Sequence, residues 1–144
     1  MITNFKFFEQ NQEDLYDVAD RYDLTYILEY GINKTDEQGN SFLMWTDDFN
    51  QIKFLVEHGI DVNITNDYGN NVLFTLSDYD SNFQWQKDKI FYLLEKGVKC
   101  VKNNTNELWY EQYSNIYEED FEEMKKFPEF KKCLKIKKAN DFNL

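Results

Sequence analysis

The sequence predicts an all-α fold, a solenoid of stacked pairs of short helices connected by protruding loops. The first observation behind this prediction is an eight-residue phrase that occurs three times, at residues 24–31, 52–59 and 90–97. Each copy contains an aliphatic residue, an aliphatic pair three positions later, a Glu, one variable position and a Gly. The second observation is that a Gly-containing turn sequence and another short apolar stretch follow each of the first two copies. Internal repetition of this kind is typical of repeat proteins, whose units bury their apolar faces by stacking.

Each phrase predicts a helix of about two turns, because apolar residues at positions i, i+3 and i+4 form one stripe. The residues of the stripe that we expect to be buried between layers are Ile27, Leu28, Leu55, Val56, Leu93 and Leu94. The closing Gly is expected to end its helix in the left-handed region, most clearly at Gly59 and also at Gly31 and Gly97. A helix this short is marginal alone, so it must pack against a neighbour.

The partners of these helices are predicted from the remaining apolar stretches. Residues 13–19 are expected to form a helix that pairs with the first copy of the phrase. Two further partner helices are expected to begin after the N-cap residues Ser41 and Asn71 and to end near Trp45 and Leu76. The predicted unit is therefore a loop, a first short helix, a second short helix and a Gly.

The C-terminal third contains no further copy of the phrase. A helix is expected to start near Ser114 or Asn115, because carboxylates fill its early turns and lysines follow, an order that complements the helix dipole. Pro128 is expected to break or restart this helix. Residues 111–144 are interpreted as a helical cap over the end of the stack, which solenoids require. A basic arm for nucleic acid is the less favoured interpretation, because the rest of the chain is acidic.

One stretch of the chain matches the phrase of a known family. Residues 55–63 read LVEHGIDVN and residues 67–73 read DYGNNVL. They resemble the ankyrin-repeat family, whose phrase is close to LLExGADVN followed by DxxGxTPLH. The resemblance covers about residues 13–110, although the TPLH tetrad is degraded throughout. The interval between closing Gly residues also grows from 28 to 38, against a family period of about 33, which indicates an insertion at about residues 77–87.

The chain is strongly acidic, with a formal net charge of −11 over 144 residues. Residues 125–144 carry seven Lys against two carboxylates, a net of +5, so residues 1–124 carry −16. Such a body repels nucleic acid and anionic membranes and accelerates encounter with a basic protein; solubility is the simpler explanation of the acidity. No Pro-, Gly- or Ser-rich linker divides the chain, so a single domain over residues 1–144 is expected.

The sequence contains no motif for catalysis, a cofactor or a metal, so none of the three is expected. His58 is the only His, which leaves no credible Ser-His-Asp triad. Cys100 and Cys133 match no metal-ligand spacing and are interpreted as free thiols, which suit a reducing cytoplasm. With no signal peptide or membrane span recognised, a cytoplasmic location is expected. The residue bias toward Asn, Lys, Ile and Tyr is compatible with an AT-rich genome, as in many bacteria and some large viruses.

The resemblance implies a protein-binding function, because ankyrin stacks bind proteins with their loop tips and first helices. On that geometry the predicted partner-binding residues are Asp36, Glu37, Trp45, Asp48, Phe49, Asp67, Tyr68, Asp78, Tyr79 and Asp80. Aromatic side chains set among carboxylates are a suitable hot spot for a basic partner. A core role for the Trp and an ordinary surface role for the two Tyr are the simpler interpretations.

The most specific functional hypothesis is an immunity protein that neutralises a basic, nuclease-like toxin domain by direct binding. Small size, acidity, the residue bias and a single degenerate stack motivate it, and small ankyrin-like proteins are among the folds found in such roles. Two alternatives stay open. One is a nucleic-acid mimic or regulator that inhibits a nucleic-acid-binding protein, with carboxylates in place of phosphates. The other is a scaffold subunit of a larger assembly, because a fold does not decide a function.

Overall fold

The computed structural model describes residues 24–142, and the helix expected at residues 13–19 lies outside them. Every regular element of the described residues is a helix, with no strand among them, which confirms the all-α prediction. The chain divides after Asp67 into two compact units. The solenoid arrangement and the single domain stay predictions.

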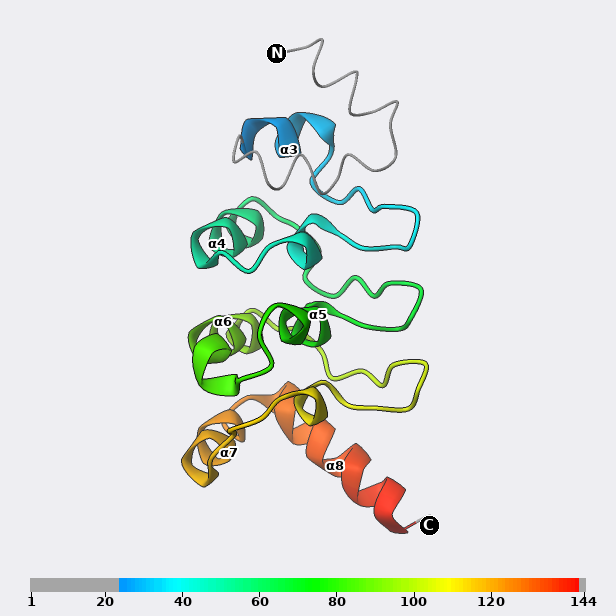
Figure 1. Cartoon of the computed structure of the whole chain (residues 1–144), viewed down its shortest axis with the longest axis vertical. Coiled ribbons are helices and arrows are strands. Elements are labelled where there is room, and N and C mark those ends of the chain that lie inside the picture. The colour runs from blue at the N-terminus through cyan, green and yellow to red at the C-terminus, as the bar shows by residue number, and fades with distance from the viewer. Residues whose placement is uncertain (1–23, 143–144) are drawn as a thin grey trace. The chain divides into compact units, whose positions relative to one another are not determined.

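The first unit contains the helix α3 (Leu24–Tyr30), the 3₁₀ helix η1 (Phe42–Trp45) and the helix α4 (Phe49–Glu57) (Figure 1). Residues 31–41, the first loop, join α3 to η1, and an antiparallel bridge between Thr35 and Ser41 closes this loop. The helices of this unit bury one apolar core, made of Ile27, Phe42, Leu43, Ile52 and Leu55.

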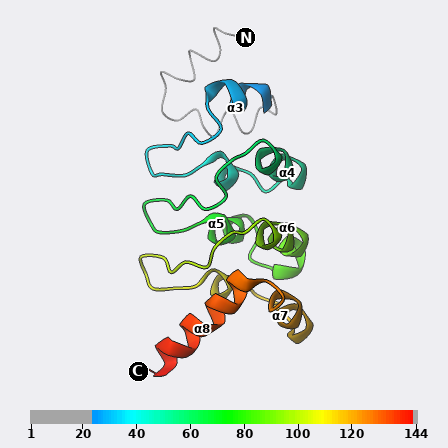
Figure 2. The ribbon, with the colours of Figure 1, turned by 180° about the vertical axis from the view of Figure 1, so that it is seen from behind.

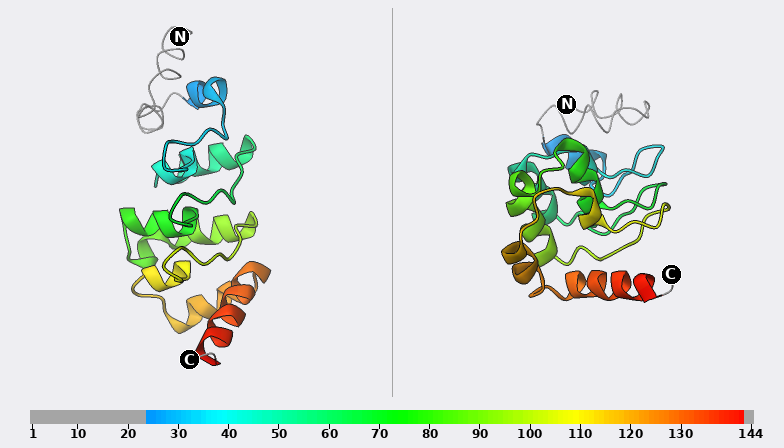
Figure 3. Two further views of the ribbon diagram at one scale, coloured as in Figure 1. Left: turned by 90° about the vertical axis from the view of Figure 1, so that its right-hand side faces the viewer. Right: turned by 60° about the horizontal axis from the view of Figure 1, so that its bottom comes forward.

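The second unit contains α5 (Val72–Tyr79), α6 (Phe83–Glu95), η2 (Trp109–Gln112), α7 (Glu118–Met124) and α8 (Pro128–Phe142). Figure 2 shows α5 and α6 side by side, and Figure 3 shows α8 next to α7. The loop that precedes α5 is the second loop, and residues 97–108, the third loop, join α6 to η2. The ring of Phe130 on α8 packs against Trp109 and Tyr110 of η2, with ring centroids 6.0 and 5.5 Å away. This aromatic packing fixes α8 to the unit.

The helix boundaries follow from capping. The Asn71 side chain accepts a hydrogen bond from the amide of Leu73 at 3.1 Å, as an N-cap should. Ser41 precedes η1 as predicted, but its side chain makes no capping bond. The three closing Gly residues have the predicted positive φ, 116° at Gly31, 90° at Gly59 and 89° at Gly97.

The prediction that both residues of each aliphatic pair are buried is wrong in two cases. The first member of each pair is buried, but Leu28 is 41% exposed and Val56 is only half-buried. Consecutive residues of a helix point about 100° apart. When the first residue of the pair faces the core, the second therefore points toward the boundary between core and solvent. Only α6 also buries its second aliphatic residue, Leu94.

The extra residues expected at about 77–87 do not form an insertion between helices. They lie mostly within helices, because α5 extends to Tyr79 and α6 starts at Phe83. Helix α6 has 13 residues, against 9 in α4. Helix α5 also has 8 residues, against 4 in η1. The longer period of the sequence therefore reflects two longer helices and a slightly longer loop, since the connections at residues 46–48 and 80–82 have the same length.

The C-terminal region continues the pattern further than the sequence indicated. Helices η2 and α7 follow the third loop in the same order as η1 and α4 follow the first loop. The missing Gly of the third loop is replaced by Asn106, with φ 67°, since Asn tolerates the left-handed region. Helix α7 starts at Glu118, later than predicted, since Asn115 has a positive φ of 60° and Tyr117, the N-cap, is extended. Pro128 starts α8. The role of residues 111–144 as a cap stays a prediction.

The prediction of two free thiols is wrong. Cys100 of the third loop and Cys133 of α8 form a disulfide bond, with their Cα atoms 5.5 Å apart. The two residues are 33 positions apart in the sequence, and only the tertiary structure brings them together. Disulfides persist in oxidising compartments and are rare in the cytosol. The cysteines therefore no longer support the cytoplasmic prediction.

Candidate partner-binding surface

The carboxylate of Asp36 is used inside the first loop. One oxygen accepts hydrogen bonds from the amides of Gln38 and Asn40, both at 2.9 Å. The other accepts from the Asn40 side chain at 3.1 Å and from the indole Nε1 of Trp45 at 3.0 Å. Asp36 and Trp45 are both half-buried. These two predicted site residues therefore hold the loop against η1, and little of the Asp36 carboxylate is left for a partner.

The tip of the first loop keeps an exposed carboxylate in Glu37. Asp67, the last residue of the first unit, is also exposed, and its amide donates to the carbonyl of Gln38 at 2.9 Å. This bond places Asp67 beside the loop tip. Of the predicted acidic residues in the first unit, Glu37 and Asp67 are therefore brought together on one surface.

Asp48 and Phe49 lie at the start of α4. The Asp48 carboxylate accepts from the amide of Gln51 at 3.0 Å and so caps the helix. Phe49 is half-buried, and the ammonium group of Lys53 lies 4.1 Å from its ring centroid, a cation–π contact. Both residues have local structural roles that account for their positions.

Tyr68 is the exposed aromatic residue of the loop that precedes α5. Its side chain is 63% exposed, while its carbonyl accepts from the amide of Asn104 in the third loop at 2.9 Å. A Cβ added to the next residue, Gly69, would lie 2.8 Å from Asn104 Oδ1, so the two loops are in close contact here. The backbone of Tyr68 is thus fixed and its ring is presented outward.

The three predicted residues at the end of α5 are all exposed. The surrounding protein partly desolvates the carboxyl group of Asp78 and raises its pKa. Asp80 accepts from the amide of Asn82 at 2.9 Å and shapes the connection to α6. Tyr79 is 43% exposed. The end of α5 thus combines the accessible ring of Tyr79 with the carboxylates of Asp78 and Asp80.

Two exposed aromatic residues of the second unit were missed by the sequence analysis. Trp85 of α6 is 73% exposed, and Tyr117, directly before α7, is 50% exposed. The signal for Trp85 was available in the helical spacing of the apolar residues of this segment, which defines a face that excludes it. The structure buries that face, which consists of Phe83, Gln86, Ile90, Leu93 and Leu94. Asp88, three residues after Trp85, is exposed on the same side of the helix.

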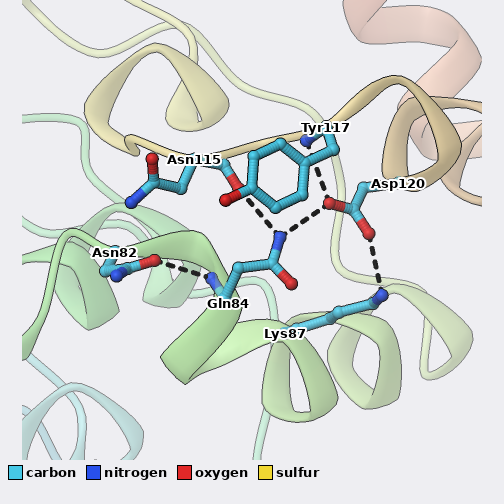
Figure 4. A network of polar contacts seen from close by, with 6 residues as sticks. All are labelled: Asn82, Gln84, Lys87, Asn115, Tyr117 and Asp120. Atoms are coloured by element: carbon cyan, nitrogen blue, oxygen red, sulfur yellow. Dashed lines mark hydrogen bonds and ion pairs between the residues drawn. The ribbon is translucent and has the colours of Figure 1, made fainter.

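A buried carboxylate fixes the segments that carry these two rings. Asp120 is 1% exposed and accepts from the Gln84 side chain at 2.8 Å and the Tyr117 amide at 3.0 Å. Its other oxygen pairs with the Lys87 ammonium at 2.8 Å (Figure 4). Burial would raise the pKa of Asp120, but the bonds from Lys87, Tyr117 and Gln84 lower it below its ordinary value. The network joins the start of α6 to the start of α7.

The described residues hold no group of three or more His, Cys, Asp or Glu side chains placed to bind a metal ion. None of the helices between residues 24 and 142 is both long and apolar enough to cross a membrane.

Comparison with protein-family models finds no match, and comparison with curated proteins finds none either. Among solved structures, the fold is similar to a chain of the Bd0816 predatory endopeptidase from Bdellovibrio bacteriovorus in complex with immunity protein Bd3460, with a TM-score of 0.52 and 19% identity. The match covers 68% of this chain and 54% of that one, so it spans about half of the similar chain. At this identity the likeness concerns the fold.

Proposed function

We propose that this chain is a non-enzymatic protein-binding module of the ankyrin-repeat type. The observation that carries the proposal is the exposure of large aromatic side chains on the second unit, with Tyr68 63% and Trp85 73% exposed. Exposed aromatic side chains on rigid elements are typical anchors of protein interfaces. The positive φ of the closing Gly residues and the bonds between successive loops support the family assignment.

The partner is proposed to be a basic protein. The −16 charge of residues 1–124 attracts a basic surface and speeds the encounter. Among basic proteins, the most specific candidate is a toxin domain, and this chain would be the immunity protein that neutralises it. The similarity to a chain from a complex of an endopeptidase with an immunity protein supports this role. The expected partner stays nuclease-like on grounds of charge, since enzymes that act on nucleic acid carry basic surfaces.

The disulfide bears on the question of the compartment in which the protein works. A cytoplasmic location stays the prediction of the sequence, whereas the bond between Cys100 and Cys133 favours an oxidising compartment. Thiol labelling of the protein in freshly lysed cells of the source organism decides between them. Labelling of both cysteines indicates the cytoplasm, and protection of both indicates an oxidising compartment.

A pull-down from the source organism with the wild-type chain, followed by mass spectrometry, tests the binding function. We expect one basic protein to co-purify, and the association rate to fall steeply as salt rises, because charges more than about 8 Å apart are screened at physiological ionic strength. An acidic partner, or binding that does not respond to salt, would contradict the proposal.

Growth rescue tests the immunity role. Co-expression of this chain should restore growth of cells that express the toxin domain. The double variant Asp67→Lys with Tyr68→Ala should rescue less well if the loop tips carry the interface, with an unchanged melting temperature because both side chains are exposed. A chain that binds the partner without any rescue would favour the scaffold alternative.

A further inference from the structure

Three segments of the second unit carry exposed aromatic and acidic side chains: the end of α5 with its connection to α6, the start of α6 and the start of α7. We define the Trp85 surface by its three exposed rings, Tyr79, Trp85 and Tyr117. The exposed carboxylates on the same three segments are Asp80, Asp88 and Glu118. The ankyrin resemblance already selected Tyr79 and Asp80 at the end of α5, whereas Trp85, Asp88, Tyr117 and Glu118 are new.

The three segments are held together by direct bonds. Ser114 accepts from the amide of Phe83 at 2.9 Å and donates its own amide to Ser81 at 2.8 Å. The Gln84 side chain donates to the carbonyl of Asn115 and to the Asp120 carboxylate, both at 2.8 Å. Figure 4 shows that Gln84 and Lys87 both reach from α6 to Asp120. The Trp85 surface is therefore a preorganised platform, and docking on it costs little ordering.

Trp85 is unusual among the three Trp of the chain. Trp109 is fully buried and Trp45 is half-buried with its indole nitrogen bonded to Asp36, whereas Trp85 is 73% exposed. A Trp side chain exposes a large apolar area, and such side chains dominate the energy of protein interfaces when a partner covers them. The fold does not require this ring, since α6 buries its opposite face.

The charge around Trp85 selects the chemistry of the partner. The two Lys residues nearest in the sequence are engaged by neighbouring side chains. The ammonium of Lys87 pairs with the buried Asp120 at 2.8 Å, and that of Lys89 donates to Gln86 at 3.0 Å. Asp88 on α6 and Glu118 in the first turn of α7 add exposed negative charge. The three segments therefore present apolar rings with net negative charge.

We infer that the Trp85 surface, rather than the loop tips, is the main docking surface for a basic protein partner, with Trp85 as its anchor. The inference rests on the proposed binding function and deepens it by naming the surface. It predicts a basic patch on the partner, with an apolar pocket that receives the indole.

The test uses the protein that co-purifies with the wild-type chain, produced recombinantly and titrated by calorimetry into variants of the full chain. Trp85→Ala should weaken binding by at least about 30-fold, and Asp88→Lys by roughly 3- to 10-fold. The control is Leu28→Ala, which removes an exposed large apolar side chain outside both candidate surfaces and should change the affinity by less than about 3-fold. Tyr68→Ala compares the loop tips with the Trp85 surface and should weaken binding less than Trp85→Ala does. All four side chains are exposed, so circular dichroism and the melting temperature should match those of the wild type.

The outcomes separate the two proposals. If Tyr68→Ala abolishes binding while Trp85→Ala binds like the wild type, the loop tips are the interface; the inference is then wrong and the binding function stands. An acidic binding partner also overturns the inference. If no protein co-purifies, the binding function itself fails, and the inference fails with it.

Discussion

The first loop and the third loop reach the same conformation with different residues. In the first loop, Asp36 Oδ1 accepts from the amides two and four positions later, at 2.9 Å each. In the third loop, Asn103 Oδ1 accepts from the corresponding amides of Thr105 and Glu107, at 3.1 and 2.9 Å. The comparison teaches that the loop requires an oxygen acceptor at this position, and a charge is optional. Asp36 has a structural role as this acceptor, so its presence in the loop is poor evidence of a binding site.

The two units also differ in how they are cross-linked. Both cysteines of the chain belong to the second unit, where the disulfide ties the third loop to α8. The first unit has no cysteine in its sequence. We therefore expect the third loop and α8 to open locally more easily when the disulfide is reduced. The loops and helices of the first unit should not respond to the redox state.

The largest expected effect concerns the cores. Leu55→Ala should lower the free energy of unfolding by about 2–5 kcal/mol, because it removes a fully buried side chain and leaves a cavity. Leu93→Ala should do the same in the second unit. The control is Leu28→Ala, which should change stability by less than about 0.5 kcal/mol since Leu28 is 41% exposed. Chemical denaturation measures all three, and a large loss for Leu28→Ala would show that burial has been assigned wrongly.

The next largest effect is the loss of stability on removal of the disulfide, which is confined to the second unit. Cys133→Ser should destabilise the protein by about 2–4 kcal/mol, because the cross-link restricts the unfolded chain. Hydrogen exchange should show faster exchange in the third loop and α8, with little change in α3 and α4. Equal loss of protection in both units would contradict the comparison, as would an unchanged stability of the reduced wild-type protein.

A smaller effect depends on pH and concerns Asp120. Its folded pKa is lowered, so its contribution to stability is present above its ordinary pKa and is lost as the pH falls through the folded value. Asp120→Asn should cost about 1–3 kcal/mol at neutral pH, since it weakens the bonds to Lys87 and the Tyr117 amide. Denaturation of both proteins as a function of pH should show this difference shrinking below about pH 4. A difference that grows in acid would reverse the sign of the linkage.

The smallest effect compares two glycines. Gly59→Ala in the first unit should cost about 1 kcal/mol, because its φ is 90° but the new Cβ would meet no atom within 4 Å. Gly69→Ala in the second unit should cost more, because its Cβ would also lie 2.8 Å from Asn104 Oδ1. Melting curves of the two variants test the order, and an equal cost would mean that the two loops separate easily.

The sequence predicted some residues of the candidate binding surface correctly and missed others. Tyr68 and Tyr79 are exposed as predicted, since turns and helix ends are usually accessible. Asp36, Asp48 and Asp80 were interpreted as binding residues, although Asp is also a common turn and N-cap residue, and their hydrogen bonds show these local roles. Trp85 was overlooked because the residues around it were interpreted as an insertion. A helical pattern for residues 83–95 would have placed it on the polar side.

The sequence by itself determined the helical class, the positive φ of the closing Gly residues and the burial of the first member of each aliphatic pair. These depend on local backbone preference and on the helical period, which neighbouring residues specify. The tertiary structure alone decided the disulfide, the internal use of the loop carboxylates, the Asp120 network and the helical pair formed by η2 and α7. Each of these needs groups that are distant in the sequence to meet, or a loop to close, and composition and spacing do not encode such contacts.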